Sequence, residues 1–319
     1  MSLIKNVTGK GFTATLIAIF VFAMALMVNA QCSSEKEIKE INDYHTKTPG
    51  GVAVCAKVLN LDPIKGDVTI RLEFIPGDDL IKDDGTLEKN IKFDTQSANG
   101  KAEVTFEKGK KMNATEVVLG MYGEKKEGSD YISVVEDYPF DTHKADLSIY
   151  LYTKPDKKKE APKDANAEHA EPNKEAAAAE EEEELEVPHL LMFVPTSSGY
   201  NIKTEKSKDS DEGYTYLTMT SSRALTVKAF STFLMFLMWS VSLAVLGLVI
   251  TVVIGGRKSE LAMFSFIATL LFAFVTVRNA QPGVPPVGTF SDVWSFFWAE
   301  GILGVCLLSV ILTWVFRKS

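Results

Sequence analysis

Long apolar stretches set the C-terminal part of the chain apart from everything before it. They run over Ala229–Ile254, Leu261–Val277 and Val293–Phe316, and short polar segments divide them. A helix needs about 17–25 predominantly apolar residues to cross the hydrocarbon core of a bilayer. The pattern therefore predicts three transmembrane helices within residues 229–319, and with them an integral membrane protein.

A further apolar run near the N-terminus indicates export. Lys5 and Lys10 precede the run Phe12–Val28, and the small residue Ala30 follows it. A basic start, an apolar centre and a small-residue end are typical of a signal peptide. Because the run exceeds the usual centre of about 7–15 residues, residues 1–30 are either a cleaved signal peptide or an uncleaved signal anchor.

The charges of the loops predict the same orientation as the leader. Arg257 and Lys258 lie between the first two predicted spans, and Arg317 and Lys318 follow the third. Short basic segments stay on the cytoplasmic side of a membrane. We therefore expect a multi-pass protein of the cell membrane, with residues 31–228 extracytoplasmic and the C-terminus cytoplasmic.

Apolar and polar residues alternate with period two in much of residues 31–228, which is typical of strands with one buried face. The predicted strands are Val52–Val58, Val68–Phe74, Ala102–Phe106, Glu116–Met121, Leu147–Leu151, His189–Val194 and Tyr214–Met219. Short strands separated by turn signals favour a β-sandwich, with a small barrel as the second choice. The predicted fold class is a membrane protein of the β + α type. It has an extracytoplasmic β-sandwich-like domain on a C-terminal three-helix transmembrane bundle, and an N-terminal signal or anchor helix.

The alternation stops over residues 154–187. Lysines open this segment, alanines and prolines follow, and Glu180–Glu184 form an uninterrupted acidic run. Such a composition cannot bury enough apolar surface to fold, and adjacent like charges repel one another. We predict a disordered acidic low-complexity insertion within the β domain.

The formal net charge of −8 argues against nucleic acid as a partner, because that partner calls for a basic patch. Cys306 lies in the last span as a small apolar residue. Cys32 and Cys55 lie in the exported domain and could form one disulfide, which their spacing leaves open. Asn113 opens an Asn-Ala-Thr sequon, a glycosylation site in a eukaryotic host.

Familiar catalytic motifs are missing from the sequence, which has no HExxH, no GxSxG and no phosphate-binding loop. The acidic group from Asp78 to Gly85 has Leu80 where a calcium-binding loop needs its first acidic residue, so we interpret it as a polar turn. None of the four histidines lies at metal-ligand spacing from another. We therefore expect no enzyme, no catalytic residue, no cofactor and no metal.

Tyr138-Pro139-Phe140-Asp141 forms a corner just before a predicted strand. Proline fixes its own φ and restricts the residue before it. We expect Phe140 to fill the core and Asp141 to accept backbone hydrogen bonds in the turn. A second interpretation makes the corner a contact between the β domain and the membrane helices.

Glu300 lies inside the last predicted span, where an ionisable group is costly and usually faces a partner or a cavity. Arg278 closes the preceding span on the same side of the membrane. We predict an Arg278–Glu300 pair that locks two antiparallel helices. Two alternatives stay open: Glu300 reaches up to the headgroups, or it lines a proton or ion pathway.

Three motifs resemble a known family. The loop Arg278–Pro286 reads RNAQPGVPP, Phe296–Glu300 reads FFWAE, and Tyr138–Asp141 reads YPFD. Together they are similar to a family of membrane proteins named only as domain of unknown function 4436. The resemblance covers most of residues 45–317, although Thr142 stands where the family pattern continues with arginine. It implies the membrane architecture and supplies no activity.

The sequence favours a non-enzymatic membrane protein that acts as scaffold, sensor or accessory subunit of a membrane assembly. Its cytoplasmic segments are too short to signal inward alone, so we expect a membrane-protein partner or a second copy besides membrane lipid. The alternative is a channel or transporter subunit with Glu300 in the membrane. A third class is an enzyme with an unrecognised site at His143 or Asp141.

Overall fold

The computed structural model describes Ala25 and residues 50–316, apart from residues 99, 125–131, 155–183, 196, 207–213, 258–259 and 284. The predicted signal or anchor helix, Cys32 and most of the predicted acidic insertion therefore lie outside the described residues. Within the described part, two β-sheets come first and three long helices follow. The predicted fold class is confirmed in these two parts.

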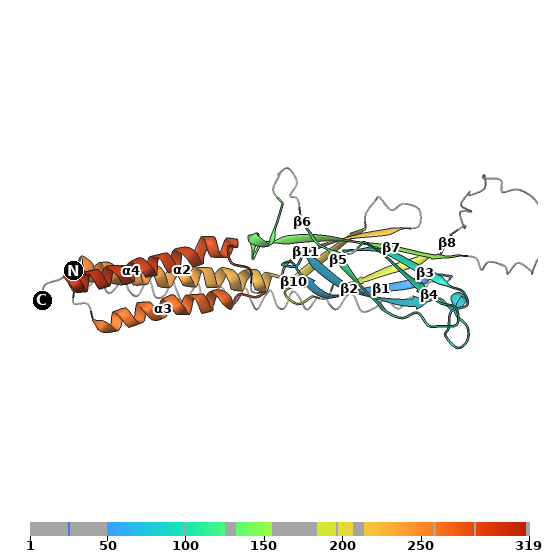
Figure 1. The fold of residues 1–319 in the computed structure, drawn as a ribbon, viewed down its shortest axis with the longest axis horizontal. Coiled ribbons are helices and arrows are strands. Elements are labelled where there is room, and N and C mark those ends of the chain that lie inside the picture. The colour runs from blue at the N-terminus through green and yellow to red at the C-terminus, as the bar shows by residue number, and fades with distance from the viewer. Residues whose placement is uncertain are drawn as a thin grey trace, which may run out of the picture.

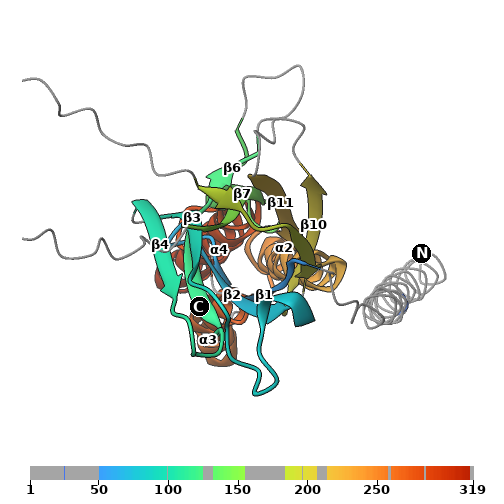
Figure 2. The same ribbon diagram turned by 90° about the vertical axis from the view of Figure 1, so that its right-hand side faces the viewer.

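Two sheets face each other in the β domain (Figure 2). The first has the strand order β5 (Thr115–Gly120), β2 (Asp67–Pro76), β1 (Val52–Asp62) and β9 (His189–Val194). The second has the order β10 (Tyr200–Lys206), β11 (Thr215–Arg223), β7 (Thr142–Thr153), β3 (Ile91–Ser97) and β4 (Gly100–Phe106). Two short strands also pair with β7, namely β6 (Tyr122–Gly123) and β8 (Leu185–Glu186). The pairing is antiparallel except between β1 and β9.

Apolar side chains from the two sheets meet in one core. Along β2 the buried residues Val68, Ile70 and Leu72 alternate with more exposed ones. Phe74, on the same strand, packs against Phe93 of β3 with the ring centroids 5.1 Å apart. Each fully buried side chain of this size contributes about 1.5–3 kcal/mol, so this core holds the two sheets together.

The alternation locates β1, β2, β4, β5, β7, β9 and β11, but it misses β3, β10 and the short strands β6 and β8. Of the large apolar residues on β3, only Ile91 and Phe93 enter the core, and β10 contributes only Tyr200 and Ile202. Two apolar positions are too weak a pattern to identify a strand. Their neighbours β7, β4 and β11 fix both strands in the sheet.

Three helices follow the β domain: α2 (Leu225–Val253), α3 (Leu261–Asn279) and α4 (Phe297–Phe316), the last of them preceded by a π-helical turn at Asp292–Phe296. Each is long and apolar enough to cross a membrane. Met238, Ile267 and Leu303, one from each helix, are fully buried in a shared apolar core. The three predicted apolar helices are confirmed, and their ends lie within a few residues of the expected ones.

The β domain and the helices form one elongated molecule (Figure 1). The end of the domain that carries β6, β10 and β11 faces the helices, whereas β3, β4 and β8 lie at the far end. Strand β11 ends at Arg223 and helix α2 begins at Leu225, so Ala224 alone connects them. A connection of one residue leaves the strand little freedom to swing against the helix.

Candidate functional site at the base of the β domain

Arg223 lies where the β domain meets the helices. Its side chain is only 4% exposed, and its Nε donates to both carboxylate oxygens of Asp141, at 3.0 Å each. Its guanidinium lies over the rings of Tyr138 and Tyr200, 5.0 and 4.7 Å from their centroids. One carboxylate therefore neutralises this buried arginine, and two aromatic faces enclose it.

Asp141 is the fully buried partner of Arg223. His143 Nε2 lies 3.0 Å from its Oδ2. Burial alone would raise the pKa of the Asp141 carboxyl, but the hydrogen bonds from His143 and Arg223 hold that pKa below its ordinary value of 3.8. Asp141 is therefore ionised at neutral pH, opposite the permanent charge of Arg223.

Tyr138 reaches from the β domain to the helices. Its side chain is fully buried, and a cis peptide bond joins it to Pro139. Its hydroxyl donates to the carbonyl oxygen of Pro282 at 2.8 Å and lies 2.7 Å from Ser231 Oγ on α2. Burial raises the pKa of the Tyr138 hydroxyl, which keeps it protonated as a donor. One side chain thus contacts the first helix and the loop between α3 and α4.

A second buried ion pair holds the loop between α3 and α4. Arg278 donates to Asp292 from Nε at 2.9 Å and from Nη2 at 2.8 Å. The same Nη2 donates to the carbonyl oxygens of Pro285 and Pro286, at 2.9 and 2.8 Å. Asp292 also accepts from the backbone N–H of Gly288 at 2.9 Å. Because both charged side chains are at most 5% exposed, the loop is fixed from within.

Gly283 brings this loop close to Arg223 of the β domain. Its φ is +77°, in a region that residues with a Cβ rarely adopt. A Cβ at this position would lie 2.8 Å from Arg223 Nη1. The two ion pairs therefore belong to one continuous junction, whose members are Tyr138, Asp141, His143, Tyr200, Arg223, Ser231, Arg278, Pro282, Gly283 and Asp292.

The predicted Arg278–Glu300 pair is wrong. Arg278 pairs with Asp292, and Glu300 Oε1 is buried with no hydrogen-bond partner among the described residues. Glu300 lies roughly 12 Å further along the helix than Asp292, at 1.5 Å per residue. An arginine held inside the loop cannot reach that far. The sequence did carry a signal, because Asp292 is the single acidic residue between Arg278 and Glu300.

The corner also differs from its expected form. Tyr138 is the buried side chain, whereas Phe140 is 51% exposed and packs edge-on against Phe290, with centroids 6.0 Å apart. Asp141 accepts hydrogen bonds from the side chain of Arg223 and not from backbone N–H groups of the turn. A tyrosine is preferred inside because its hydroxyl finds partners there. The contact with the helices that the second interpretation expected is made by Tyr138.

Four members of the junction had not stood out in the sequence: Arg223, Tyr200, Ser231 and Asp292. Arg223 gave no clear signal, because it lies several residues before the apolar stretch Ala229–Ile254. Its partner lies 82 residues away in the sequence, and no local pattern connects the two.

The other sequence candidates lie apart from the junction. Cys55 is half-buried on β1, and its disulfide with Cys32 stays a prediction because Cys32 is not described. Asn113 is exposed in the segment before β5. Asp84 accepts two hydrogen bonds from Thr86 in a polar turn. Over the described ranges of the chain, no group of three or more His, Cys, Asp or Glu is arranged to hold a metal ion.

These observations define a class of protein: a two-sheet β domain joined directly to three helices that could cross a membrane. The family model described as Domain of unknown function (DUF4436) matches residues 42–221, so the chain belongs to that family, as the resemblance implied. The DUF4436 match ends at residue 221, short of the expected range of residues 45–317, so the RNAQPGVPP and FFWAE motifs lie outside it. They lie within the range of a second model, Domain of unknown function (DUF8686), which matches residues 223–317. No curated protein matches the chain. The two matched ranges adjoin at the end of β11, where the junction lies.

Removing the hydroxyl of Tyr138 is expected to weaken the junction measurably. Tyr138→Phe leaves the Pro282 carbonyl and the Ser231 hydroxyl without this partner in a buried site, which costs about 1–3 kcal/mol. Denaturant unfolding of the full chain in lipid nanodiscs measures the loss. Tyr122→Phe is the matched control, because the exposed Tyr122 hydroxyl bonds only at the surface, to Asp146. Equal effects of the two changes would contradict a specific role for Tyr138.

Acid is expected to weaken the junction through Asp141. Its pKa in the folded protein lies below the ordinary 3.8, so its contribution is complete above about pH 4 and is lost as pH falls through the folded pKa. The difference in unfolding free energy between the native chain and Asp141→Asn should therefore shrink in acid. Unfolding titrations of both proteins from neutral pH downwards measure this, and a difference that stays constant to the lowest pH would refute it.

Proposed function

We propose that this chain is a non-enzymatic integral membrane protein that holds an extracytoplasmic β domain in a fixed pose on its transmembrane bundle, as an accessory subunit of a membrane assembly. The observation that carries the proposal is the junction. A tethered enzyme domain needs no buried connection to its anchor. A subunit needs such a connection if it presents a surface at a fixed distance from the membrane, or if it transmits a conformational change from its β domain to its helices.

Three features make the junction suited to that task. Strand β11 continues into α2 through Ala224 alone. The Asp141–Arg223 pair ties the corner to the end of that strand. Tyr138 ties the same corner to α2 and to the loop after α3. The β domain is therefore joined to the helices at several points, so it follows their movement as a rigid body.

The charges and aromatic residues near the helix ends support the extracytoplasmic position of the β domain. Helix α2 runs away from the β domain (Figure 1), and the basic residue Arg257 follows its C-terminal end at Val253. Short basic loops stay cytoplasmic. At the domain end, the exposed rings of Phe290 and Trp294 lie 5.8 Å apart, as is typical of the membrane interface. Protease added to intact cells should cut the β domain, and digestion only after lysis would place it in the cytoplasm.

Crosslinking in native membranes tests the role as a subunit. We expect the native chain to be recovered in one complex of defined size, with a membrane partner or a second copy. A short Gly-Ser insertion after Ala224 should reduce recovery of that complex while the β domain stays folded, whereas the same insertion after Gly109, in an exposed turn of the β domain, should not. A chain that stays monomeric in its own membrane, or an assembly indifferent to the first insertion, would overturn the proposal.

A channel or transporter subunit is the second candidate, favoured by one observation. Glu300 lies in α4, and its Oε1 has no hydrogen-bond partner within the described part of the chain. Against a pore inside one chain, the space between the three helices is filled by apolar side chains such as Met238, Ile267 and Leu303. Conductance in liposomes that disappears with Glu300→Ala would favour this class over the first.

A further inference from the structure

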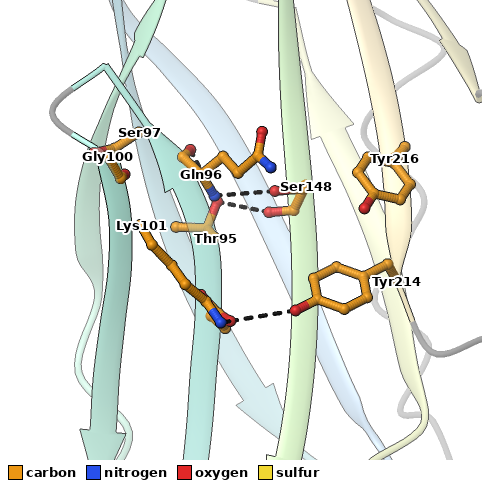
Figure 3. A pocket seen from close by; sticks show the side chains of 9 residues that line it. Thr95, Gln96, Ser97, Gly100, Lys101, Ser148, Tyr214 and Tyr216 are labelled. Carbon is orange, nitrogen blue, oxygen red and sulfur yellow. Dashed lines mark hydrogen bonds and ion pairs between the residues drawn. The ribbon is translucent and has the colours of Figure 1, made fainter. Parts of the chain in front are cut away.

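A hollow lies on the larger sheet, and none of the residues that line it belongs to the junction (Figure 3). Its volume is about 570 Å³, within the range of roughly 300–1,000 Å³ that small-molecule sites occupy. The side chains and backbone that line it come from β3, β4, β7 and the start of β11: Asp94, Thr95, Gln96, Ser97, Gly100, Lys101, Ser148, Tyr214 and Tyr216. Most of these residues carry a hydrogen-bonding side chain.

The hollow exists because β3 stops pairing with β7 partway along its length. The backbone register between β3 and β7 ends at the pair Asp94–Tyr150. Beyond it, Thr95 Oγ1 donates to the carbonyl oxygen of Ser148 at 2.6 Å, and Ser148 Oγ accepts from the backbone N–H of Gln96 at 3.0 Å. Side-chain hydroxyls thus replace the missing ladder, and the sheet opens with hydroxyl groups along the gap.

Asp94 supplies an unused acceptor in this hollow. The residue is only 2% exposed, and its Oδ2 receives the ion pair from Lys101 and a 3.3 Å hydrogen bond from the Tyr214 hydroxyl. Its Oδ1 is buried and has no hydrogen-bond partner among the residues that the structure describes. Because a buried carboxylate oxygen is costly to leave unpaired, this atom calls for a donor beyond the described residues.

The aromatic wall of the hollow belongs to a row of stacked tyrosines. Tyr150 lies 4.5 Å from Tyr214 and 5.1 Å from Tyr152 between ring centroids, and Tyr214 lies 5.8 Å from Tyr216. Desolvation, with Asp94 nearby, raises the pKa of the Tyr214 hydroxyl. These side chains therefore offer an apolar ring surface and a neutral hydroxyl together, which is the combination that amphipathic ligands require.

The charges of the hollow cancel. Asp94 is paired with Lys101, and the neighbouring Lys92 is paired with Glu103. A phosphate or a metal ion would meet no net opposite charge. A neutral ligand that carries several hydroxyl groups on an apolar ring frame matches the unpaired carboxylate oxygen, the hydroxyl-lined gap and the tyrosine wall at once.

We propose that this hollow is a binding site for a neutral saccharide of one or two rings. A sugar hydroxyl donates to Asp94 Oδ1, other hydroxyls exchange hydrogen bonds with the side chains of the gap, and the ring packs on Tyr214 and Tyr216. The site lies on the sheet and not at the junction, so it goes beyond the proposed role as a subunit and does not depend on it.

Saturation-transfer-difference NMR on the full chain in phosphatidylcholine nanodiscs tests the proposal. Glucoside and maltoside detergents are avoided because their headgroups are saccharides. The probes are maltose, cellobiose, lactose, mannobiose and chitobiose. We expect a signal from at least one of them, with affinity at least tenfold lower for Asp94→Asn and several-fold lower for Tyr214→Phe. Tyr122→Phe, which removes a similar hydroxyl–carboxylate bond outside the hollow, should bind as the native chain does.

Each contrary outcome is decisive. No signal from any probe, as when water alone fills the hollow, would overturn the proposal. So would native affinity in both Asp94→Asn and Tyr214→Phe with their thermal transitions unchanged, or binding of inorganic phosphate or Ca²⁺ at the site in place of sugars. The assay uses one purified chain, so failure of the membrane assembly in crosslinking leaves its outcome unaffected.

Discussion

Asp141→Ala is expected to destabilise the β domain by about 3–5 kcal/mol, because it leaves the buried guanidinium of Arg223 without a counter-charge. Arg223 is 4% exposed and cannot turn out to water without breaking its contacts with Tyr138 and Tyr200. Arg223→Met should cost a similar amount, because it leaves the fully buried Asp141 carboxylate with His143 as its remaining side-chain partner. Denaturant unfolding of the full chain, followed by circular dichroism of the strands, measures both.

The double variant separates the ion pair from the packing around it. If the pair acts as a unit, Asp141→Ala combined with Arg223→Met should be more stable than the sum of the two single losses predicts. Asp146→Ala provides the control on the same strand, because Asp146 is exposed and bonds only to Tyr122 and Thr218. We expect a loss below about 1 kcal/mol for this surface contact. Losses of similar size for Asp141→Ala and Asp146→Ala would contradict the buried pair.

The fold was predictable from the sequence where local patterns are strong. The alternation along β2 and the apolar length of α2 each identify an element without knowledge of the rest. Strand β3 was missed because Ile91 and Phe93 alone carry its pattern, and its position depends on pairing with β4 and β7. Local periodicity shows which face of an element is buried. Where that pattern is weak, as in β3, pairing with neighbouring strands decides whether the segment forms a strand.

The junction was only half predictable, for a different physical reason. The Tyr138–Asp141 corner stood out because proline restricts its backbone, yet the choice of Tyr138 over Phe140 as the buried ring depends on acceptors at Pro282 and Ser231. These lie 144 and 93 residues away. The hollow had no sequence signal at all, because it follows from the departure of β3 from β7. Sites built by long-range contacts leave no periodic trace in the chain.

The second large effect is expected at the other ion pair. Asp292→Asn removes the charge that faces Arg278 while keeping the size of the side chain, and should destabilise the helical part by about 3–5 kcal/mol. The Arg278 side chain is only 5% exposed. It would keep hydrogen bonds to the backbone carbonyl oxygens of Pro285 and Pro286 and to the side chain of Asn279, none of which carries a charge. The loop should loosen first, because Asp292 also binds the backbone N–H of Gly288.

Glu300→Gln is the matched comparison, since it also converts a carboxylate within the candidate span Asp292–Phe316 into an amide. Glu300 takes no part in the ion pair of Arg278, so its neutralisation removes no salt bridge and should change stability by less than about 1 kcal/mol. Thermal unfolding of the full chain in nanodiscs, followed by the helical signal, compares the two variants. A loss for Glu300→Gln as large as that for Asp292→Asn would mean that Arg278 depends on Glu300 after all. With the expected order, Arg278 holds the loop beneath the β domain through Asp292, and Glu300 takes no part in holding that loop.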